Sequence, residues 1–145
     1  MLGIVITGHG KFASGLLQAV EQIIGKQVQC MAVDFPEGMA TEELHQMLEA
    51  ASKDCDLGEG LVFLTDLLGG SPFRHAAQLT LTHPQWQVIT GTNMQLAVEM
   101  MLDRDGINAV QFLDIALECG HRGLTSLWHE QQKQPLQPPL DIDGI

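Results

Sequence analysis

The chain has 145 residues, of which 45% are hydrophobic, and its formal net charge is −11 because 18 acidic residues outnumber 7 lysines and arginines. A chain of this length is most simply one domain with a proper buried core. The excess of acidic residues argues against nucleic acid or an anionic membrane surface as the main partner, since both are bound through clustered cations, and it suits a protein that meets basic protein surfaces.

Strand-like and helix-like segments alternate along the chain. In order, the expected elements are a strand at Leu2–Thr7, a helix at Phe12–Ile24, a strand at Val28–Val33, a helix at Thr41–Lys53, a strand at Gly60–Asp66, a helix at Pro72–His83, a strand at Trp86–Gly91, and helices at Met94–Arg104 and Asn108–Gln132. The strands are mostly apolar without alternation, which is typical of strands covered on both faces. The pattern predicts an open, doubly wound α/β sheet, mainly parallel, with strand order 2-1-3-4, room for a fifth strand, and helices on both faces.

Three residues mark predicted helix ends. Gly25 is placed to cap the carboxyl end of the first helix. Thr41 is placed to cap the amino end of the second helix, and Pro72 suits the first position of the third.

The ends of the chain and its cysteines predict the cellular compartment of the protein and the limits of its domain. The first residues lead straight into an apolar strand without a charged leader, so no signal peptide is expected, and no apolar stretch reaches the length of a membrane helix. Cys30, Cys55 and Cys119 are odd in number and form no C-x-x-C pair, which indicates free thiols in a reducing cytosol. We expect a cytoplasmic domain at 1–131. The proline-rich segment 132–145 is then a disordered tail, a strand added to a partner, or a linker to another domain.

The most informative residue is His9, which follows the first strand in the sequence Gly8-His9-Gly10. The flanking glycines leave the imidazole with little cover and allow a reacting group to approach the backbone. In open α/β sheets, the carboxyl end of the strands is where ligands bind. This position favours a chemical role over a packing role.

Asp66 ends the third predicted strand. In the order 2-1-3-4, strands 1 and 3 are neighbours on either side of the topological switch point, so His9 and Asp66 should meet at one crevice. A carboxylate that accepts a hydrogen bond from one imidazole nitrogen fixes the tautomer and raises the basicity of the other nitrogen. That second nitrogen becomes a nucleophile.

The turn Gly69-Gly70-Ser71-Pro72 follows and leads into a helix. Glycines free the backbone, a helix N-terminus offers unpaired N–H groups to an anion, and the Ser71 hydroxyl adds a donor. Each part alone has a plainer interpretation: a structural histidine, an aspartate in a turn, and a loop before a helix. Their convergence on one crevice predicts a phosphoryl acceptor site.

These residues also resemble a known family. Gly-His-Gly after the first strand, Phe-Leu-Thr-Asp at the third and Gly-Gly-Ser-Pro-Phe after it look like the enzyme IIA component of the mannose-type sugar phosphotransferase system, over residues 1 to about 130. The resemblance implies that His9 is the phosphorylated histidine (on Nε2), that Asp66 orients it, and that Gly69, Gly70 and Ser71 bind phosphate. It implies no metal and no cofactor.

The same resemblance implies partners. A IIA component takes its phosphoryl group from the histidine-containing phosphocarrier protein and passes it to a IIB component, while membrane IIC and IID components move the sugar. Family members often form a homodimer through a swapped C-terminal strand, and the proline-rich end of this chain departs from that pattern. The segments 65–70 and 118–123 look most like the N-acetylgalactosamine or galactosamine branch. The second of these segments contains His121 and Arg122, whose role the sequence leaves undecided.

Two other functions and one metal site are alternatives to the relay. A response-regulator-like receiver phosphorylated on Asp66 lacks paired acidic residues after the first strand. A flavodoxin-like ligand-binding module lacks the third glycine of the dinucleotide fingerprint, a Walker lysine and aromatic residues for stacking. A zinc site made of His9, Cys119 and His121 has no supporting ligand spacing.

Overall fold

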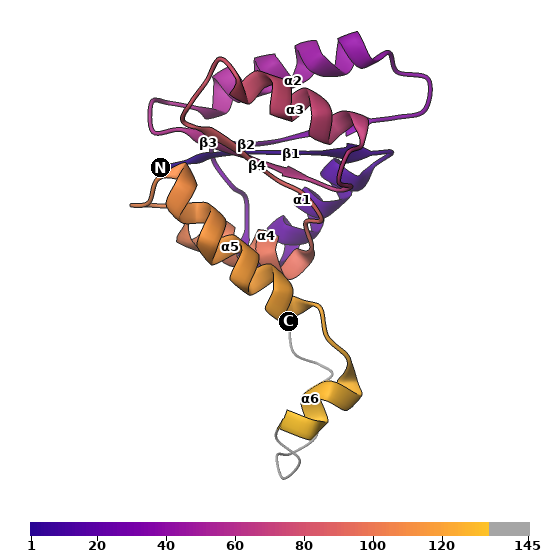
Figure 1. Cartoon of the computed structure of the whole chain (residues 1–145), viewed down its shortest axis with the longest axis vertical. Coiled ribbons are helices and arrows are strands. Elements are labelled where there is room, and N and C mark those ends of the chain that lie inside the picture. Colours follow the sequence, from indigo (N-terminus) through magenta and orange to yellow (C-terminus); the bar gives the residue numbers. More distant parts are fainter. Residues whose placement is uncertain (134–145) are drawn as a thin grey trace.

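The computed structural model describes residues 1–133. Its elements are β1 (Gly3–His9), α1 (Phe12–Ile24), β2 (Cys30–Phe35), α2 (Thr41–Cys55), β3 (Leu61–Thr65), α3 (Ser71–Thr80), β4 (Trp86–Ile89), α4 (Met94–Asp103), α5 (Ala109–Gly123) and α6 (Leu127–Lys133). The strands form one parallel sheet in the order β2-β1-β3-β4 (Figure 1). The predicted fold class and strand order are confirmed.

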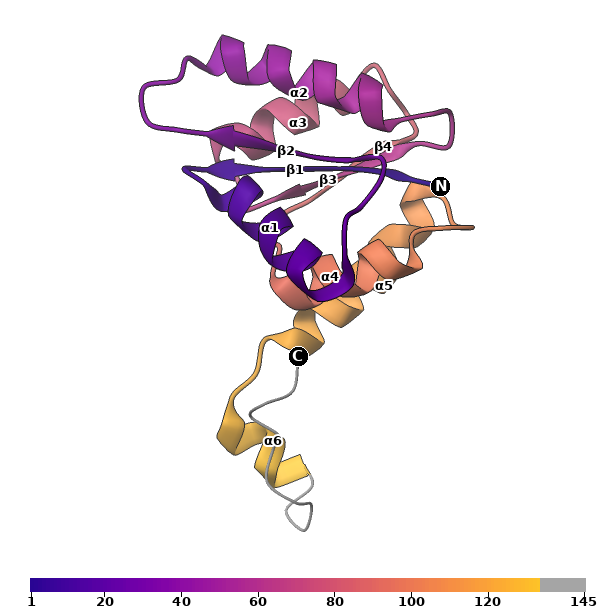
Figure 2. The same ribbon diagram turned by 180° about the vertical axis from the view of Figure 1, so that it is seen from behind.

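Helices cover both faces of the sheet. α2 and α3 lie on one face, and α1, α4 and α5 lie on the other (Figures 1 and 2). Successive side chains of a strand point to opposite faces, so β1 sends Ile4 and Ile6 into the core under α1, α4 and α5, and Val5 into the core under α2 and α3. This two-sided burial explains why the strands read as continuous apolar runs.

The carboxyl end of β2 fixes the start of α1. Lys11 occupies the N-cap position of α1 and makes no capping bond with its side chain. Instead, the Asp34 carboxylate on β2 accepts a hydrogen bond from the Ser14 N–H at 2.9 Å and another from the Ser14 hydroxyl at 2.6 Å. A residue from another strand therefore satisfies a free N–H of the first turn.

Two polar side chains stabilise the opposite end of the sheet, where the parallel strands begin. Arg104, 1% exposed, donates hydrogen bonds to the backbone carbonyls of Leu2, Val28 and Gln29. Asp56 closes the turn between α2 and β3, where its carboxylate accepts the indole N–H of Trp86 at 2.7 Å and the backbone N–H groups of the glycines at 58 and 60 at 2.8 and 3.1 Å. Burial alone would raise the pKa of Asp56, but these hydrogen bonds outweigh it and lower the pKa below its ordinary value.

Two predictions about helix ends are wrong: the last residue of the third helix and the capping residue of the second. The third helix ends at Thr80 and not at His83, whose ring stacks on Trp86 at 3.7 Å between ring centroids. The second helix begins at Thr41, but Ala40 is its N-cap and no side chain caps it. Gly25 does cap α1, with φ +84° and its N–H bonded to the Glu21 carbonyl. Pro72 lies in the first turn of α3, one residue after the first position that the sequence predicted for it.

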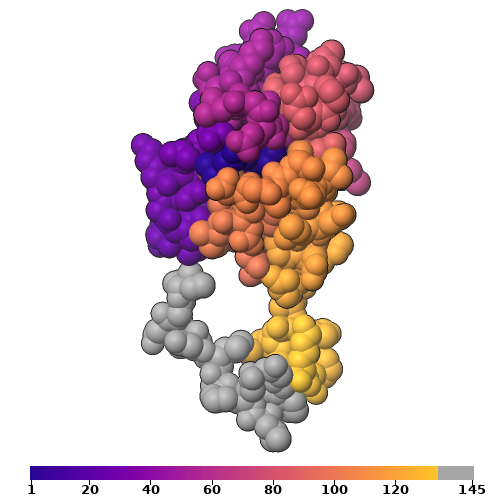
Figure 3. All heavy atoms as spheres, turned by 90° about the vertical axis from the view of Figure 1, so that its left-hand side faces the viewer, coloured from indigo at the N-terminus to yellow at the C-terminus, as the bar shows by residue number. Residues whose placement is uncertain are grey.

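The largest correction concerns the predicted helix at Asn108–Gln132. α5 ends at Gly123, Leu124 is extended, and α6 is a separate short helix that projects away from the sheet (Figures 1 and 3). Ser126 caps α6 because its hydroxyl accepts the His129 N–H at 3.1 Å. The predicted tail 132–145 begins inside α6, and 134–145 lie outside the described residues. No helix among residues 1–133 is long and apolar enough to cross a membrane.

Candidate active site

His9 is the last residue of β1, and its two neighbouring glycines are required by different contacts. A Cβ at Gly8 would stand 2.5 Å from a ring carbon of Phe12 and 2.9 Å from the carboxyl carbon of Asp66. Gly10 adopts φ +57° and donates its N–H to the Phe35 carbonyl at 2.9 Å, which turns the chain out of the strand. The predicted freedom around the imidazole is confirmed, since the His9 side chain is 46% exposed.

The structure brings Asp66 against His9, as the strand order predicts. Thr65, the last residue of β3, pairs with Thr7 of β1, so Asp66 lies beside the end of β1. Its Oδ2 accepts the backbone N–H of His9 at 2.8 Å and lies 2.8 Å from Nδ1 of the same residue. Its Oδ1 accepts the Leu67 N–H at 2.8 Å.

These contacts set the charge and the tautomer. Burial raises the pKa of Asp66, but the hydrogen bonds from His9 and from the Leu67 N–H outweigh it, so the pKa lies below its ordinary value. The carboxyl group is therefore ionised at neutral pH and can only accept hydrogen bonds. Nδ1 of a neutral His9 must carry the proton, and Nε2 keeps its lone pair.

The loop 69–71 lies against the free edge of the imidazole. Gly69 has φ +82°, and its carbonyl accepts the Arg74 Nε–H at 2.8 Å, so α3 braces the loop that precedes it. A Cβ at Gly70 would stand 2.7 Å from Cε1 and 3.5 Å from Nε2 of His9. Ser71 begins α3 at this point, where the first-turn N–H groups have no partner within the helix.

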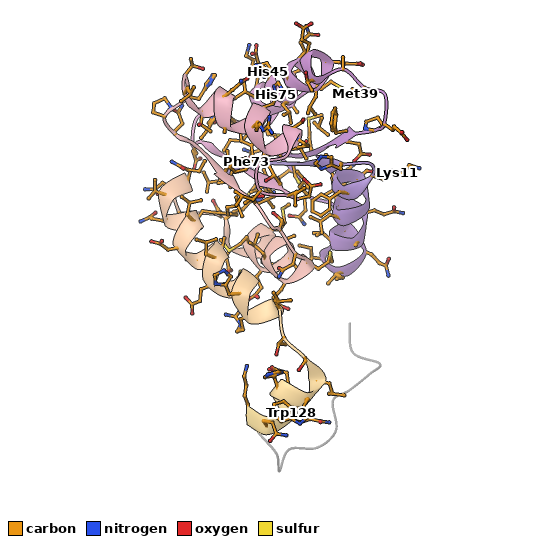
Figure 4. All side chains as sticks on the ribbon, turned by 45° about the vertical axis from the view of Figure 1, so that its right-hand side comes forward. Lys11, Met39, His45, Phe73, His75 and Trp128 are labelled. Atoms are coloured by element: carbon orange, nitrogen blue, oxygen red, sulfur yellow. The ribbon has the colours of Figure 1, made fainter. Side chains whose placement is uncertain are left out.

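The surroundings of His9 combine apolar and cationic groups. The Phe35 ring packs edge-on against the imidazole, with 5.9 Å between centroids. Leu67 and Leu68 are 60% and 72% exposed on the loop after β3. Lys11 lies directly before α1, at the edge of the sheet where α1 begins (Figure 4). The imidazole is thus bordered by an aromatic ring, and the loop that follows Asp66 presents exposed apolar side chains.

Other residues singled out in the sequence do not join this site. His121 and Arg122 lie on α5, on the opposite face of the sheet from α3, and Arg122 binds Glu99 of α4 at 2.6 and 2.9 Å. Cys119 is buried in the core under the same helices. His75 forms a pair with His45 of α2.

Sequence reasoning missed the second contact of Asp66 to the His9 backbone and the brace from Arg74 to the loop. Neither has a sequence signal of its own, because each depends on the distance between a side chain and a backbone atom. The pattern did predict the convergence of His9, Asp66 and the 69–71 turn, and the structure confirms it.

Comparisons with known proteins identify the family of this chain. The family model EIIA-man, described as the fructose IIA component of the phosphotransferase system, matches residues 3–117. YadI of Escherichia coli strain K12, described as a phosphotransferase enzyme IIA component, is 39% identical over 135 residues, which cover 93% of this chain and 92% of YadI. The mannose-specific EIIAB component of the same organism is 32% identical over 127 residues, 87% of this chain, and the chain spans 39% of its length.

A solved structure shares the architecture. The EIIA component from Streptococcus agalactiae superposes with a TM-score of 0.83 at 27% identity, covering 89% of this chain and 99% of that one. The receiver and ligand-binding alternatives are therefore set aside. The chain belongs to the EIIA-man family and is a IIA component that relays phosphoryl groups in a sugar phosphotransferase system.

Proposed function

We propose that His9 carries the phosphoryl group of this relay on Nε2, that Asp66 orients the ring, and that Gly69, Gly70 and Ser71 bind the phosphoryl oxygens. The observation that supports this assignment is the 2.8 Å contact between Nδ1 of His9 and Oδ2 of an ionised Asp66. It leaves Nε2 as the free nucleophile of a half-exposed ring.

The proposed transfer conserves protons at the ring. The Nε2 lone pair of neutral His9 attacks the phosphorus of the donor's phosphohistidine, and the P–N bond of the donor breaks as the new P–N bond forms. Positive charge that develops on the His9 ring is stabilised by the Asp66 carboxylate, while Nδ1 keeps its proton. In this proposal the N–H groups at the start of α3, near Ser71, bind the equatorial oxygens. The reverse steps hand the group to the acceptor.

We propose two protein partners for this surface: the histidine-containing phosphocarrier protein as donor and a IIB component as acceptor, with membrane IIC and IID components served indirectly. Exposed Leu67 and Leu68 beside His9 offer a contact area that both partners can use in turn. The net charge of −11 favours partners with basic faces.

Further assignments extend this proposal. We place the protein in the cytoplasm, treat 1–131 as the relay domain with 132–145 as its tail, and expect a homodimer. For the sugar we propose the N-acetylgalactosamine or galactosamine branch, on the sequence segments 65–70 and 118–123 alone. The EIIAB relative is named for mannose, the name of YadI mentions no sugar, and the family description names fructose. Phosphate transfer to purified IIB components of each sugar class tests the branch, and light scattering tests the dimer.

The test of the site is intact mass after incubation with phosphoenolpyruvate, enzyme I and the phosphocarrier protein. The wild-type chain should gain one phosphate that is labile in acid and stable in alkali, and His9→Ala should gain none. His121→Ala, which removes an exposed imidazole on α5, is the matched control and should behave as wild type. Phosphate on His9→Ala would refute the assignment of His9.

A further inference from the structure

A second pair of imidazoles lies outside the relay site. His45 of α2 and His75 of α3 face each other with 3.0 Å between their Nδ1 atoms and 5.2 Å between ring centroids (Figure 4). At this distance at least one Nδ1 must lack a proton, because two N–H groups cannot point at one another. One ring therefore donates its Nδ1–H to Nδ1 of the other ring. The shared proton lies between two nitrogen lone pairs, a position that another cation can also occupy.

The spacing of the nitrogens suits a transition metal. Metal–imidazole bonds of about 2.0–2.1 Å put two nitrogens about 2.9 Å apart when they bind at a right angle and about 3.4 Å apart in a tetrahedral arrangement. The observed 3.0 Å falls between these limits. The two ring planes are inclined at 71°, so the rings are not stacked on each other and both Nδ1 atoms lie at the contact between the two helices.

The surroundings also suit a cation. The two rings line a hollow of about 360 Å³ together with Glu42, Gln46 and Gln78, so every lining side chain is polar and one is acidic. Both imidazoles are half-buried.

We propose that His45 and His75 form a bis-histidine site for a divalent transition metal of the class that prefers imidazole, with Zn²⁺ as the probe. Among residues 1–133 no group of three or more His, Cys, Asp and Glu side chains is placed to hold a metal. Two imidazoles are thus the protein ligands, water fills the open positions, and Glu42 balances charge at the rim. Binding displaces the shared proton to solvent.

A metal bound at this site would link α2 to α3. α2 and α3 pack side by side on one face of the sheet, and His75 lies one turn beyond Ser71, where α3 meets the His9 loop. A metal that joins His45 to His75 would hold α3 in place and so stiffen the loop 69–71. The proposal does not depend on which residue carries the phosphoryl group.

The test is Zn²⁺ affinity measured by competition with a chromogenic chelator, on the wild type, His45→Gln and His75→Gln. Each substitution should weaken binding at least tenfold, because a two-ligand site loses half of its protein ligands. His121→Gln is the matched control and should bind as wild type. Zn²⁺ should also raise the melting temperature of the wild type and of the control, and the two variants should lose this rise.

His9→Gln provides the competing outcome, because the relay imidazole could itself attract Zn²⁺. Loss of binding in His9→Gln with unchanged binding in both pair variants would overturn the proposal, and so would equal affinity in all chains. Circular dichroism on each variant establishes that it is folded. If His75→Gln does not fold, His75→Ala, which keeps a strong helix former in α3, replaces it.

Discussion

Gly70→Ala is a sharp test of how the loop controls His9. Gly70 has φ −70° and ψ 166°, angles that alanine adopts without strain, so the backbone should not change. The added methyl group, however, would stand 2.7 Å from Cε1 of His9, where ordinary contact begins at 3.4 Å. The substitution therefore acts on the imidazole and on little else.

The size of the effect follows from these distances. The ring must move by about 0.7 Å, and the methyl group would still lie beside Nε2, 3.5 Å away before any movement. The hydrogen bond from Nδ1 to Asp66 is 2.8 Å long, so a ring displaced by this amount loses its alignment. A misplacement near 1 Å can cost about 100-fold in rate, and we expect phosphorylation to slow about 10- to 100-fold, equivalent to about 1.4–2.7 kcal/mol.

Stability should change far less. Alanine is a poorer N-cap than glycine, which costs about 1 kcal/mol and lowers the melting temperature by about 3 °C. Gly15→Ala is the matched control: it lies inside α1 with no atom within 4 Å of the added Cβ. It should raise stability by about 0.5–1 kcal/mol and leave the phosphorylation rate unchanged.

The assay is the initial rate of phosphate incorporation from the phosphocarrier protein, with the tautomer and hydrogen bond of His9 followed by nitrogen NMR. The steric argument is refuted if the Gly70→Ala variant is phosphorylated at the wild-type rate and the Nδ1–H signal of its His9 is unchanged. A melting temperature more than about 10 °C below wild type would also refute it, since the damage would then lie in the fold.

Three further predictions concern charged side chains. Asp66→Asn replaces a charged acceptor of two His9 hydrogen bonds by a neutral one, so phosphorylation of the folded variant should slow about 100-fold, or about 2.7 kcal/mol, in the same assay; transfer at the wild-type rate would remove the role of Asp66. Asp56→Asn should lose about 1–2 kcal/mol of unfolding free energy at pH 7 in urea titrations. Because the folded pKa of Asp56 is lowered, this contribution is present above about pH 4, the unfolded pKa, and is lost as pH falls through the folded pKa; a deficit that does not shrink at all as pH falls below 4 would contradict the assignment. Arg74→Gln removes the hydrogen bond to the Gly69 carbonyl, so phosphorylation should slow several-fold while the free energy of unfolding falls by less than about 1 kcal/mol. A free energy of unfolding that falls by more than the activation free energy of phosphorylation rises would contradict this role of Arg74.

The fold and the central pair of the site could be predicted because they depend on periodic features. Continuous apolar runs such as Leu2–Thr7 identify strands buried on both faces, and their alternation with amphipathic helices sets a parallel sheet with right-handed crossovers. From that topology alone, residues at the carboxyl ends of strands 1 and 3 become neighbours. His9 and Asp66 are 57 residues apart, yet only the strand order was needed to pair them.

The rest depends on distances that no period encodes. Arg104 reads as an ordinary polar residue at the end of a helix, and only the packing of α4 under the sheet turns it inward to the carbonyls of Leu2 and Gln29, which directly precede β1 and β2. His45 and His75 each fall on a helix surface, and their contact follows from the packing of α2 on α3. The break at Gly123 was missed because an apolar pattern continues through Leu124 and Leu127, whereas the glycine and the Ser126 cap end one helix and begin another.

Asp66 explains how the site remains ordered while its imidazole stays exposed. One oxygen, Oδ2, accepts both the backbone N–H and the ring Nδ1–H of His9, and the other accepts the Leu67 N–H. The ring cannot turn without disturbing a carboxylate that also joins the ends of β1 and β3. Orientation is therefore supplied by the sheet, and little reorganisation is needed as charge develops on the ring. Gly70 lies beside Nε2 and carries no side chain, so in the proposed function the loop can contact a phosphoryl group without enclosing it. A relay needs this balance, because any contact that held the phosphorylated state too firmly would slow the second transfer as much as it helped the first.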